Sequence, residues 1–269
     1  MIVMIIVKIG GRALEQGLGN VLDDLKTLYD RGEKIVFVHG GGDIVTFYSK
    51  RLGIEPKFVI SPSGVRSRYT SPEELEVYLM VMAGKINKEI TAKMLRRNIK
   101  AIGLSGVDGK LLLAERKKRI IIVDEKGRKR VIEGGYTGKI KQVNAEVLLS
   151  LLEKSFLPVI APIAYGTEGE LLNVDGDQAA SEIAIAMKAN TLILLTDVQG
   201  VIIDNNIVSC IKVKEVKEIV KSVGMGMNRK IILASRAIEG GVKRVIISSA
   251  LISNPIINAL KGSGTVIEP

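Results

Sequence analysis

Two aliphatic segments near the start of the chain, residues 2–9 and 35–38, each lead into a cluster of glycines. The clusters are Gly10-Gly11 and Gly40-Gly41-Gly42, and apolar side chains at helical spacing follow both of them. A strand, a glycine turn and a helix, repeated along a chain, form the unit of a parallel sheet covered by helices. The sequence therefore predicts an α/β fold with an open, mainly parallel central sheet sandwiched between helices.

The same alternation continues to the end of the chain. Ser71-Pro72-Glu73-Glu74 is typical of a helix start, since Ser71 can cap the helix and Glu74 can complete a capping box. This helix is expected to reach Gly84, and a second to begin near residue 86. No low-complexity linker divides the chain, so we expect two lobes on one sheet, residues 1–170 and 171–269. Further strands are predicted at 101–104, 157–161, 191–196 and 245–248, and further helices at 144–154, 178–188, 213–222, 228–239 and 254–260.

Composition excludes several classes of protein. The single cysteine, Cys210, cannot build a disulfide scaffold, and the single histidine, His39, cannot complete a Cys/His zinc site. A hydrophobic content of 46% argues against disorder. The apolar N-terminus is interrupted by Lys8 and is too short for a membrane span or a signal segment, so we expect a cytoplasmic protein with no membrane association.

The glycine clusters are candidates for binding an anion. Glycines let backbone N–H groups approach an anion closely, and the N-terminus of the following helix adds a favourable field. Lys8 lies two residues before the first cluster. Neither G-x-x-x-x-G-K-[ST] nor a G-x-G-x-x-G after a strand occurs, so phosphate binding would need another loop geometry. The alternative is that the glycines only form tight turns.

Two carboxylates, Asp175 and Asp177, precede the predicted helix at 178–188. They repel each other unless a cation joins them, and magnesium or paired lysines would be suitable. For Asp177 an ordinary helix N-cap is an equally supported alternative. Lys230 is expected in the first turn of the helix at 228–239, where a cation opposes the macrodipole, which suggests that its ammonium group meets an anion. A solvated lysine is the alternative.

The polar turn Thr196-Asp197-Val198-Gln199-Gly200 is a further candidate ligand loop, and His39 is expected to serve packing rather than catalysis. A basic hairpin is predicted over residues 115–132. Between residues 115 and 130 basic residues outnumber acidic ones by eight to three, which could steer an acidic macromolecule. A merely solvated hairpin is one alternative. A nucleic-acid-binding module, from a different class, is disfavoured because Ile120-Ile121-Ile122 stands where interleaved aromatics would be expected.

Several segments together resemble the amino-acid kinase family, and within it the N-acetylglutamate kinase branch. They occur in family order along nearly the whole chain. Gly64 to Thr70 and Tyr136-Thr137-Gly138-Lys139 are similar to kinases that act on 2-aminoadipate or glutamate attached to an acidic amino-group carrier protein, LysW. The segments that carry the family resemblance are Val7 to Gly11, Val38 to Gly42, Gly64-Val65-Arg66, Asn173 to Ala180, Thr196 to Gly200, and Gly226-Met227 with Lys230.

The resemblance implies ATP- and Mg²⁺-dependent phosphoryl transfer to a side-chain carboxylate, giving an acyl phosphate in lysine and possibly arginine biosynthesis. It implies no tightly bound metal held by the protein. The acceptor and the dimer contact would belong to the N-terminal lobe and ATP to the C-terminal lobe, with LysW as partner and a homodimer as the assembly. The alternative in the same class is an N-acetylglutamate kinase acting on the free small molecule.

The resemblance also implies roles for individual residues. Lys8 and Lys230 would neutralise the transferring phosphoryl group, and Asp177 would hold both lysines. Asp175 departs from the Asn common in acetylglutamate enzymes. The implied acceptor residues are Gly41, Gly42, Arg66 and Asn173; the implied nucleotide residues are Gly10, Gly11, Thr196, Asp197, Gly200 and Met227. The implied partner-binding residues are Arg116, Lys117, Lys118, Arg119, Arg128, Lys129 and Arg130.

Overall fold

The computed structural model describes residues 3–62, 64–224 and 226–269. The start of the strand predicted at 2–9, and Met225 of the sequence segment 224–230, therefore lie outside the described residues. The strands of the central sheet, in chain order, are β1 Met4–Ile9, β2 Lys34–His39, β5 Ala101–Gly106, β6 Leu112–Arg116, β9 Gly138–Val143, β10 Leu157–Gly166, β11 Leu171–Asn173, β12 Thr191–Thr196, β15 Cys210–Lys212, β16 Arg244–Ser249 and β17 Thr265–Glu268.

These eleven strands of the described chain form one sheet in the order β15-β17-β16-β12-β1-β2-β10-β6-β9, with β5 and β11 also paired to β10. The central pairs β12-β1, β1-β2 and β2-β10 are parallel. Lys8 lies beside Leu194 of β12 and Val38 of β2, so the carboxyl ends of neighbouring strands meet at one edge of the sheet. The predicted open, mainly parallel α/β sheet is confirmed.

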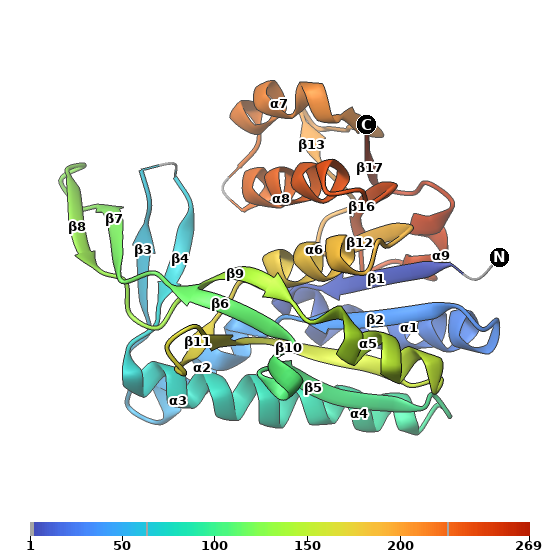
Figure 1. The fold of residues 1–269 in the computed structure, drawn as a ribbon. Coiled ribbons are helices and arrows are strands. Elements are labelled where there is room, and N and C mark those ends of the chain that lie inside the picture. The colour runs from blue at the N-terminus through green and yellow to red at the C-terminus, as the bar shows by residue number, and fades with distance from the viewer. Residues whose placement is uncertain (1–2, 63, 225) are drawn as a thin grey trace.

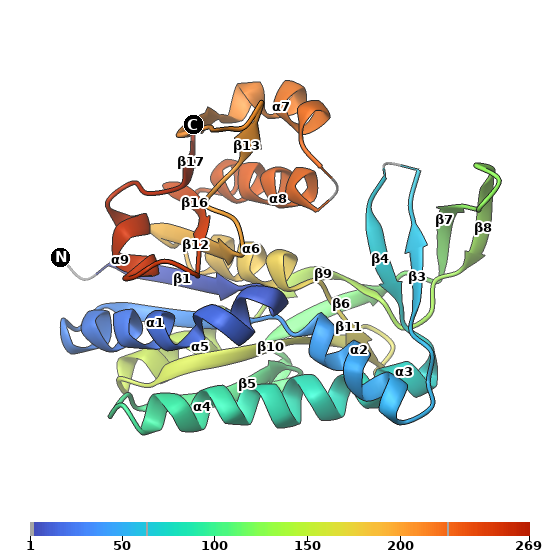
Figure 2. The same ribbon diagram turned by 180° about the vertical axis from the view of Figure 1, so that it is seen from behind.

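Helices cover both faces of this sheet (Figures 1 and 2). Alternate residues of β1 divide between two cores, with Ile5, Val7 and Ile9 in one and Ile6 in the other, because successive side chains of a strand point to opposite faces. The first core receives α1 Gly11–Asp30, α2 Gly42–Arg51, α3 Pro72–Leu79, α4 Asn87–Leu95 and α9 Pro255–Leu260. The second receives α5 Ala145–Glu153, α6 Gly176–Ala186, α7 Val216–Ser222 and α8 Met227–Glu239.

The helices predicted around residues 72–97 form one continuous rod, because a π-helix, η1 Met80–Ile86, joins α3 to α4. Ser71 caps α3 as predicted, and its Oγ accepts from the Glu74 N–H at 3.2 Å. The predicted capping box is wrong, however. The Glu74 carboxylate turns to the guanidinium of Arg68, since a buried arginine needs a charged partner more than the exposed cap needs a second bond.

Two antiparallel hairpins project from the same end of the molecule (Figures 1 and 2). One, β7 Arg119–Val123 with β8 Lys129–Glu133, confirms the hairpin predicted between residues 115 and 132. The other, β3 Lys57–Ile60 with β4 Arg66–Tyr69, was not predicted, because its strands lack an apolar alternation and none of their residues is buried. Smaller elements are β13 Ile202–Ile203, β14 Asn206–Ile207 and the 3₁₀ helices η2 Asp108–Lys110 and η3 Val213–Glu215.

No helix in the described part of the chain is both long and apolar enough to cross a membrane.

Two glycines of α1 give opposite predictions for the same substitution. A Cβ on Gly17 would lie 2.3 Å from the backbone oxygen of Ala250, whereas a Cβ on Gly19 would meet no atom within 4 Å. We expect Gly17→Ala to lower the free energy of unfolding by about 1–3 kcal/mol, because backbone must shift to admit the methyl group. Gly19→Ala should raise it by about 0.5–1 kcal/mol through helix propensity. Denaturant unfolding of both variants measures the difference; equal effects would contradict the close packing at Gly17.

Candidate active site

A pocket of about 280 Å³ opens where β1, β2 and β10 end. Such an edge is where open parallel sheets bind ligands. The lining comes from segments far apart in the sequence. It includes residues singled out from the sequence, namely Lys8, Gly11, the Gly40–Gly42 loop, Arg66, Lys117, Asn173 and Asp175, together with Arg68 and Arg229. Asp177 and Lys230 do not line it.

Two lysines converge on one carboxylate beside this pocket. The Nζ of Lys8 lies 2.6 Å from Asp177 Oδ1, and the Nζ of Lys230 lies 2.5 Å from Oδ2. Side-chain exposure is only 8% for Lys8, 12% for Lys230 and 13% for Asp177. Three elements thus bring their charges together: the end of β1, the first turn of α6 and the first turn of α8.

Burial and charge act in opposite directions within this cluster. Burial lowers the pKa of Lys8, and the charge of Lys230 lowers it further, while Asp177 opposes both. Burial alone would raise the pKa of Asp177, but the two ammonium groups outweigh it and hold that pKa far below its usual range. Asp177 is therefore a carboxylate at any pH at which the protein works.

Asp175, not Asp177, caps α6. Asp175 Oδ1 accepts from the backbone N–H of Gln178 at 2.8 Å, so the N-cap alternative for Asp177 is wrong. The sequence offered two carboxylates near one helix start, and only their contacts with other elements distinguish them. The second oxygen of Asp175 faces Arg229 of α8 at 3.6 Å. Of the cations suggested for this carboxylate pair, the structure shows paired lysines on Asp177. The arginine near Asp175 was not predicted.

The two glycine clusters pack against each other. A Cβ on Gly11 would lie 3.3 Å from the amide nitrogen of Gly42, and one on Gly41 would lie 2.2 Å from Ile86 Cδ1. Gly41 also has a φ of +152°, which side-chain-bearing residues rarely adopt. Larger residues would therefore force the loops apart. The two clusters therefore need glycine because their backbones touch, and not only because each of them forms a tight turn.

A second hollow, of about 270 Å³, adjoins the first and shares Gly11 and Gly42 with it. It brings together four predicted nucleotide residues, Gly10, Gly11, Thr196 and Asp197. The Thr196 hydroxyl donates to Asp197 at 2.9 Å, and Arg12 pairs with the same carboxylate at 3.2 Å. Burial raises the pKa of Asp197, but these contacts overcome it and lower the pKa.

The other two predicted nucleotide residues line neither hollow. A Cβ on Gly200 would lie 2.7 Å from Thr265 Oγ1, which places this glycine against β17. Met227 begins α8 and packs, partly buried, against the second core. Their role in nucleotide binding stays a prediction.

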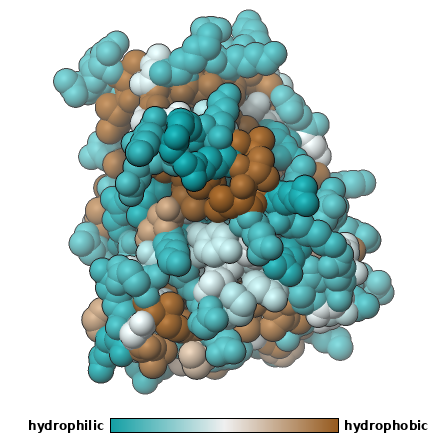
Figure 3. Space-filling view, turned by 90° about the vertical axis from the view of Figure 1, so that its left-hand side faces the viewer, coloured by the Kyte–Doolittle hydropathy of each residue, from teal (hydrophilic) through white to brown (hydrophobic). Residues whose placement is uncertain are grey.

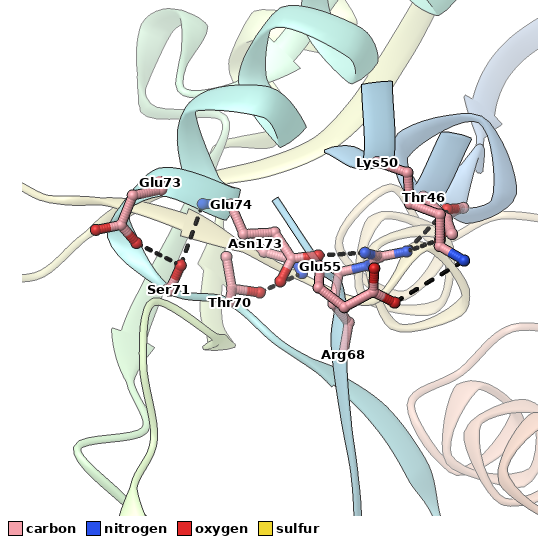
Figure 4. Close-up of polar contacts among 10 residues, drawn as sticks. Thr46, Lys50, Glu55, Arg68, Thr70, Ser71, Glu73, Glu74 and Asn173 are labelled. Carbon is pink, nitrogen blue, oxygen red and sulfur yellow. Dashed lines mark hydrogen bonds and ion pairs between the residues drawn. The ribbon is translucent and has the colours of Figure 1, made fainter. Parts of the chain in front are cut away.

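The predicted acceptor residues all line the first pocket. Asn173 donates from Nδ2 to Thr70 Oγ1 at 2.9 Å (Figure 4). Arg66 lies over the ring of Phe58, with 3.6 Å between its Cζ and the ring centroid, and pairs with no carboxylate of the described residues.

Arg68 was missed by the sequence analysis. Figure 4 shows its guanidinium between Glu74 and Thr46, with which it forms a buried ion pair and a 2.5 Å hydrogen bond. It also donates to the backbone oxygen of Gly42 at 2.9 Å. Arg68 thereby ties β4 to the second glycine loop. The spacing could have indicated it, because residues two apart in a strand share a face, as Arg66 and Arg68 do.

For two further basic residues of the pocket, the sequence predicted either a different role or none. Lys117 was predicted only as a partner-binding residue, yet it lines the pocket, and Arg229 was assigned no role. Arg229 stands directly before Lys230 at the start of α8, so the helix that delivers one lysine also delivers a second cation. A charge count along α8 could have suggested it.

His39 is buried in the sheet and lines neither hollow. Its Nε2 lies 3.2 Å from Asn87 Nδ2 and its Nδ1 lies 3.0 Å from the Gly40 oxygen, a pattern that fits a neutral ring with the proton on Nδ1. Burial lowers its pKa to about 4, against the raising effect of the Gly40 bond. Packing is the role that the structure supports.

The pKa of His39 predicts a loss of stability in mild acid. The unfolded chain takes up a proton near pH 6.5 and the folded chain only near pH 4, so the unfolded state binds more protons between these values. The contribution of His39 to the free energy of unfolding is therefore fully present above pH 6.5. It falls as the pH drops towards 4, by about 3 kcal/mol over the whole interval. Urea unfolding at pH 7 and 4.5 should show a smaller loss for His39→Gln than for the wild type. Equal losses would contradict a neutral buried ring.

The basic hairpin carries its charge unevenly. Arg128 and Arg130 both pair with Asp124, Lys118 pairs with Glu168, and Arg116 donates to the Gly135 oxygen. Among the described residues Arg119 and Lys129 have no carboxylate partner, and they share a strand face with the exposed, directly opposed pair Ile121 and Val131. Figure 3, which views the molecule from the hairpin side, shows hydrophilic side chains around hydrophobic areas.

Comparisons with known proteins agree with this fold. The sequence profile of the amino acid kinase family matches residues 3–249. A LysW-aminoadipate/LysW-glutamate kinase from Sulfolobus acidocaldarius is 55% identical over 267 residues, covering 98% of this chain and 100% of its own. One of the same name from Sulfurisphaera tokodaii is 55% identical over 265 residues, covering 98% and 100%. The crystal structure of smu.665 from Streptococcus mutans UA159 superposes with a TM-score of 0.80 at 25% identity, covering 98% of both chains.

Proposed function

Since the chain belongs to the amino acid kinase family, as the sequence resemblance predicted, we propose that it phosphorylates the side-chain carboxylate of 2-aminoadipate or glutamate carried on LysW. ATP is the phosphoryl donor and an acyl phosphate is the product. Identity of 52–55% along the full length of relatives with that activity in their name supports this substrate class over free N-acetylglutamate.

One observation carries the proposal: two buried ammonium groups converge on Asp177, and one of them, that of Lys8, belongs to a residue that lines the first pocket. A carboxylate acceptor, with a pKa of about 4, is already ionised and needs no general base. Its oxygen attacks the γ-phosphorus, the bond to the bridging oxygen breaks, and ADP leaves without a proton transfer. The reaction therefore needs positive charge and positioning, which lysines and backbone N–H groups supply.

In this proposal Lys8 and Lys230 neutralise the γ-phosphoryl group, and Asp177 positions them. The nucleotide phosphates occupy the hollow at Gly10 and Gly11, with Thr196, Asp197, Gly200 and Met227 on the nucleotide side. Gly41, Gly42, Arg66 and Asn173 hold the acceptor. The N-terminal lobe, 1–170, then provides the acceptor site and the dimer contact, and the lobe at 171–269 provides the ATP site.

Mg²⁺ would enter with ATP rather than through a protein cage. The described residues contain no cluster of three or more His, Cys, Asp or Glu suited to a metal ion. Both oxygens of Asp177 face ammonium groups, and Asp175 caps α6. When bound, the ion would neutralise charge on the β- and γ-phosphates.

A homodimer in the cytoplasm completes the proposal, and exposed Met80 and Leu95 on the α3–α4 rod are compatible with a dimer contact.

Loss of either lysine should slow the chemical step. We expect Lys8→Ala and Lys230→Ala to lower kcat by about 10²–10³-fold, because their charge is needed most where charge shifts in the transition state. ATP affinity should change by less than about threefold. Steady-state kinetics with ATP binding measured separately tests this, with Lys154→Ala, an exposed lysine at the opposite edge of the sheet, as control. A change confined to KM would contradict the assignment.

The acceptor is identified by trapping the product. Hydroxylamine converts an acyl phosphate to a hydroxamate, which can be quantified with carrier-linked 2-aminoadipate, carrier-linked glutamate and free N-acetylglutamate in parallel. We expect hydroxamate from at least one carrier-linked acceptor, with kcat/KM about tenfold or more above that of the free compound. Turnover of the free compound alone would establish the N-acetylglutamate kinase alternative.

Charge reversal on the hairpin tests the carrier. Arg119→Glu with Lys129→Glu removes the two cations of the β7–β8 face that lack a carboxylate partner among the described residues. We expect kcat/KM for the carrier-linked acceptor to fall about tenfold at low salt, and its salt dependence to flatten, because encounter with an acidic protein is steered by charge. Unchanged efficiency and unchanged salt dependence would remove the hairpin from carrier binding.

A further inference from the structure

Lys117 lines two cavities at once. One is the first pocket of the active site, and the other is a cavity of about 460 Å³ on the outside of the sheet, called here the outer hollow. The two cavities therefore share a wall at this side chain. The outer hollow is lined by Glu115, Arg116, Lys117, Lys118, Arg119, Lys139, Thr167 and Glu168.

The Lys117 ammonium group has no partner within the described chain. Its backbone N–H donates to the Thr137 oxygen at 2.9 Å, which fixes the main chain, but its side chain forms no hydrogen bond or ion pair there. Among the other cations of the pocket, Lys8, Arg68 and Arg229 each face a carboxylate. Arg66 does not: the face of its guanidinium lies over the ring of Phe58, so its N–H donors, like the Lys117 ammonium group, are left for an acceptor.

The surroundings of Lys117 favour an added anion. Burial lowers its pKa, the positive charge of Arg229 lowers it further, and Asp175 only partly compensates. A partly buried cation next to a second cation is stabilised when a carboxylate binds between them.

The acceptor brings such a carboxylate. When 2-aminoadipate or glutamate is attached to a carrier through its amino group, both of its carboxylates stay ionised. One must face Lys8 and Lys230 to receive the phosphoryl group, and the other has to be satisfied within the pocket.

We propose that Lys117, together with Arg66 of the acceptor site, binds this non-reacting carboxylate and that the carrier-linked acceptor reaches the pocket through the outer hollow. The inference rests on the proposed function and deepens it: it names the side from which the acidic carrier approaches and the residue over which the acceptor passes.

A competing approach lies on the other side of the β7–β8 hairpin. A cavity of about 620 Å³ there is lined by residues of both hairpins, among them Phe58, Ile122, Asp124 and Lys126. It shares no lining residue with the active-site pocket. Its two arginines, Arg128 and Arg130, are already paired with Asp124. In the outer hollow, by contrast, both acidic residues are engaged, Glu115 by Lys141 and Glu168 by Lys118, so the remaining cations face an incoming anion.

Matched charge reversals distinguish the two approaches. Lys139 lines the outer hollow and Lys126 the competing cavity, and both are exposed lysines whose ammonium groups have no ion pair in the described structure. We expect Lys139→Glu to lower kcat/KM for the carrier-linked acceptor about tenfold at low salt, and Lys126→Glu to lower it less than about twofold. Phosphorylation of a free N-acylated acceptor should be nearly unaffected by either. Equal losses, or a larger loss for Lys126→Glu, would overturn the proposed approach.

Lys117 itself is tested by separating KM from kcat. Lys117→Ala should raise KM about 10–100-fold for carrier-linked and free N-acylated acceptors alike, with kcat and the KM for ATP within about threefold. Lys117→Arg should recover part of the loss, which a purely structural role would not give. A rise in the KM for ATP instead would place Lys117 on the nucleotide and overturn the assignment.

Failure of this inference is distinguishable from failure of the proposed function. If the wild-type enzyme forms no hydroxamate with carrier-linked acceptors, the proposed function fails and the inference with it. If the wild type is active on them while Lys117→Ala behaves as the wild type, only the inference fails.

Discussion

The ion cluster Lys8–Asp177–Lys230 is the interaction on which the rest of the site depends. Two positive charges and one negative charge lie nearly out of solvent, so the cluster keeps one uncompensated positive charge. Burying an unbalanced charge costs free energy unless a further partner is present. In the proposed reaction a phosphoryl group supplies that partner. The packing of β1, α6 and α8 thus holds together a cluster whose positive charge favours a bound anion.

The helix dipoles have opposite effects on two members of this cluster. Asp177 stands in the first turn of α6, where a negative charge is favourable, while Lys230 stands in the first turn of α8, where a positive charge is not. Asp175 takes the capping bond of α6, which frees Asp177 for the lysines. The unfavourable position of Lys230 is thereby offset by a carboxylate from the neighbouring helix.

Local patterns predicted the elements and not the contacts between them. Six strands of the sheet, β1, β2, β5, β10, β12 and β16, contain aliphatic runs and were predicted. The other five, β6, β9, β11, β15 and β17, were not predicted, because they are short or interrupted by charged residues. The pairing of Glu74 with Arg68 could not be predicted, because it depends on where the β3–β4 hairpin meets α3, and this hairpin has no apolar alternation. Likewise nothing near Asp175 and Asp177 in the chain tells which one caps the helix. The convergence of Lys8 and Lys230 entered through family resemblance, since 222 positions separate them.

The proposed route of the carrier depends on how charge is compensated along the basic hairpin. At the hairpin tip Asp124 neutralises Arg128 and Arg130, so formal charge overstates the field there. Towards the base, Arg119, Lys139 and Lys117 form no ion pair within the described chain, although Glu115 lies opposite Lys139 and Asp175 partly compensates Lys117. Lys126 and Lys129 near the tip are unpaired as well, so the position of Lys117 between the outer hollow and the pocket, and not a greater amount of charge, favours the base of the hairpin. In the proposed route, an acidic carrier attracted by these cations is held at the base of the hairpin, where its attached acceptor can reach the buried lysines.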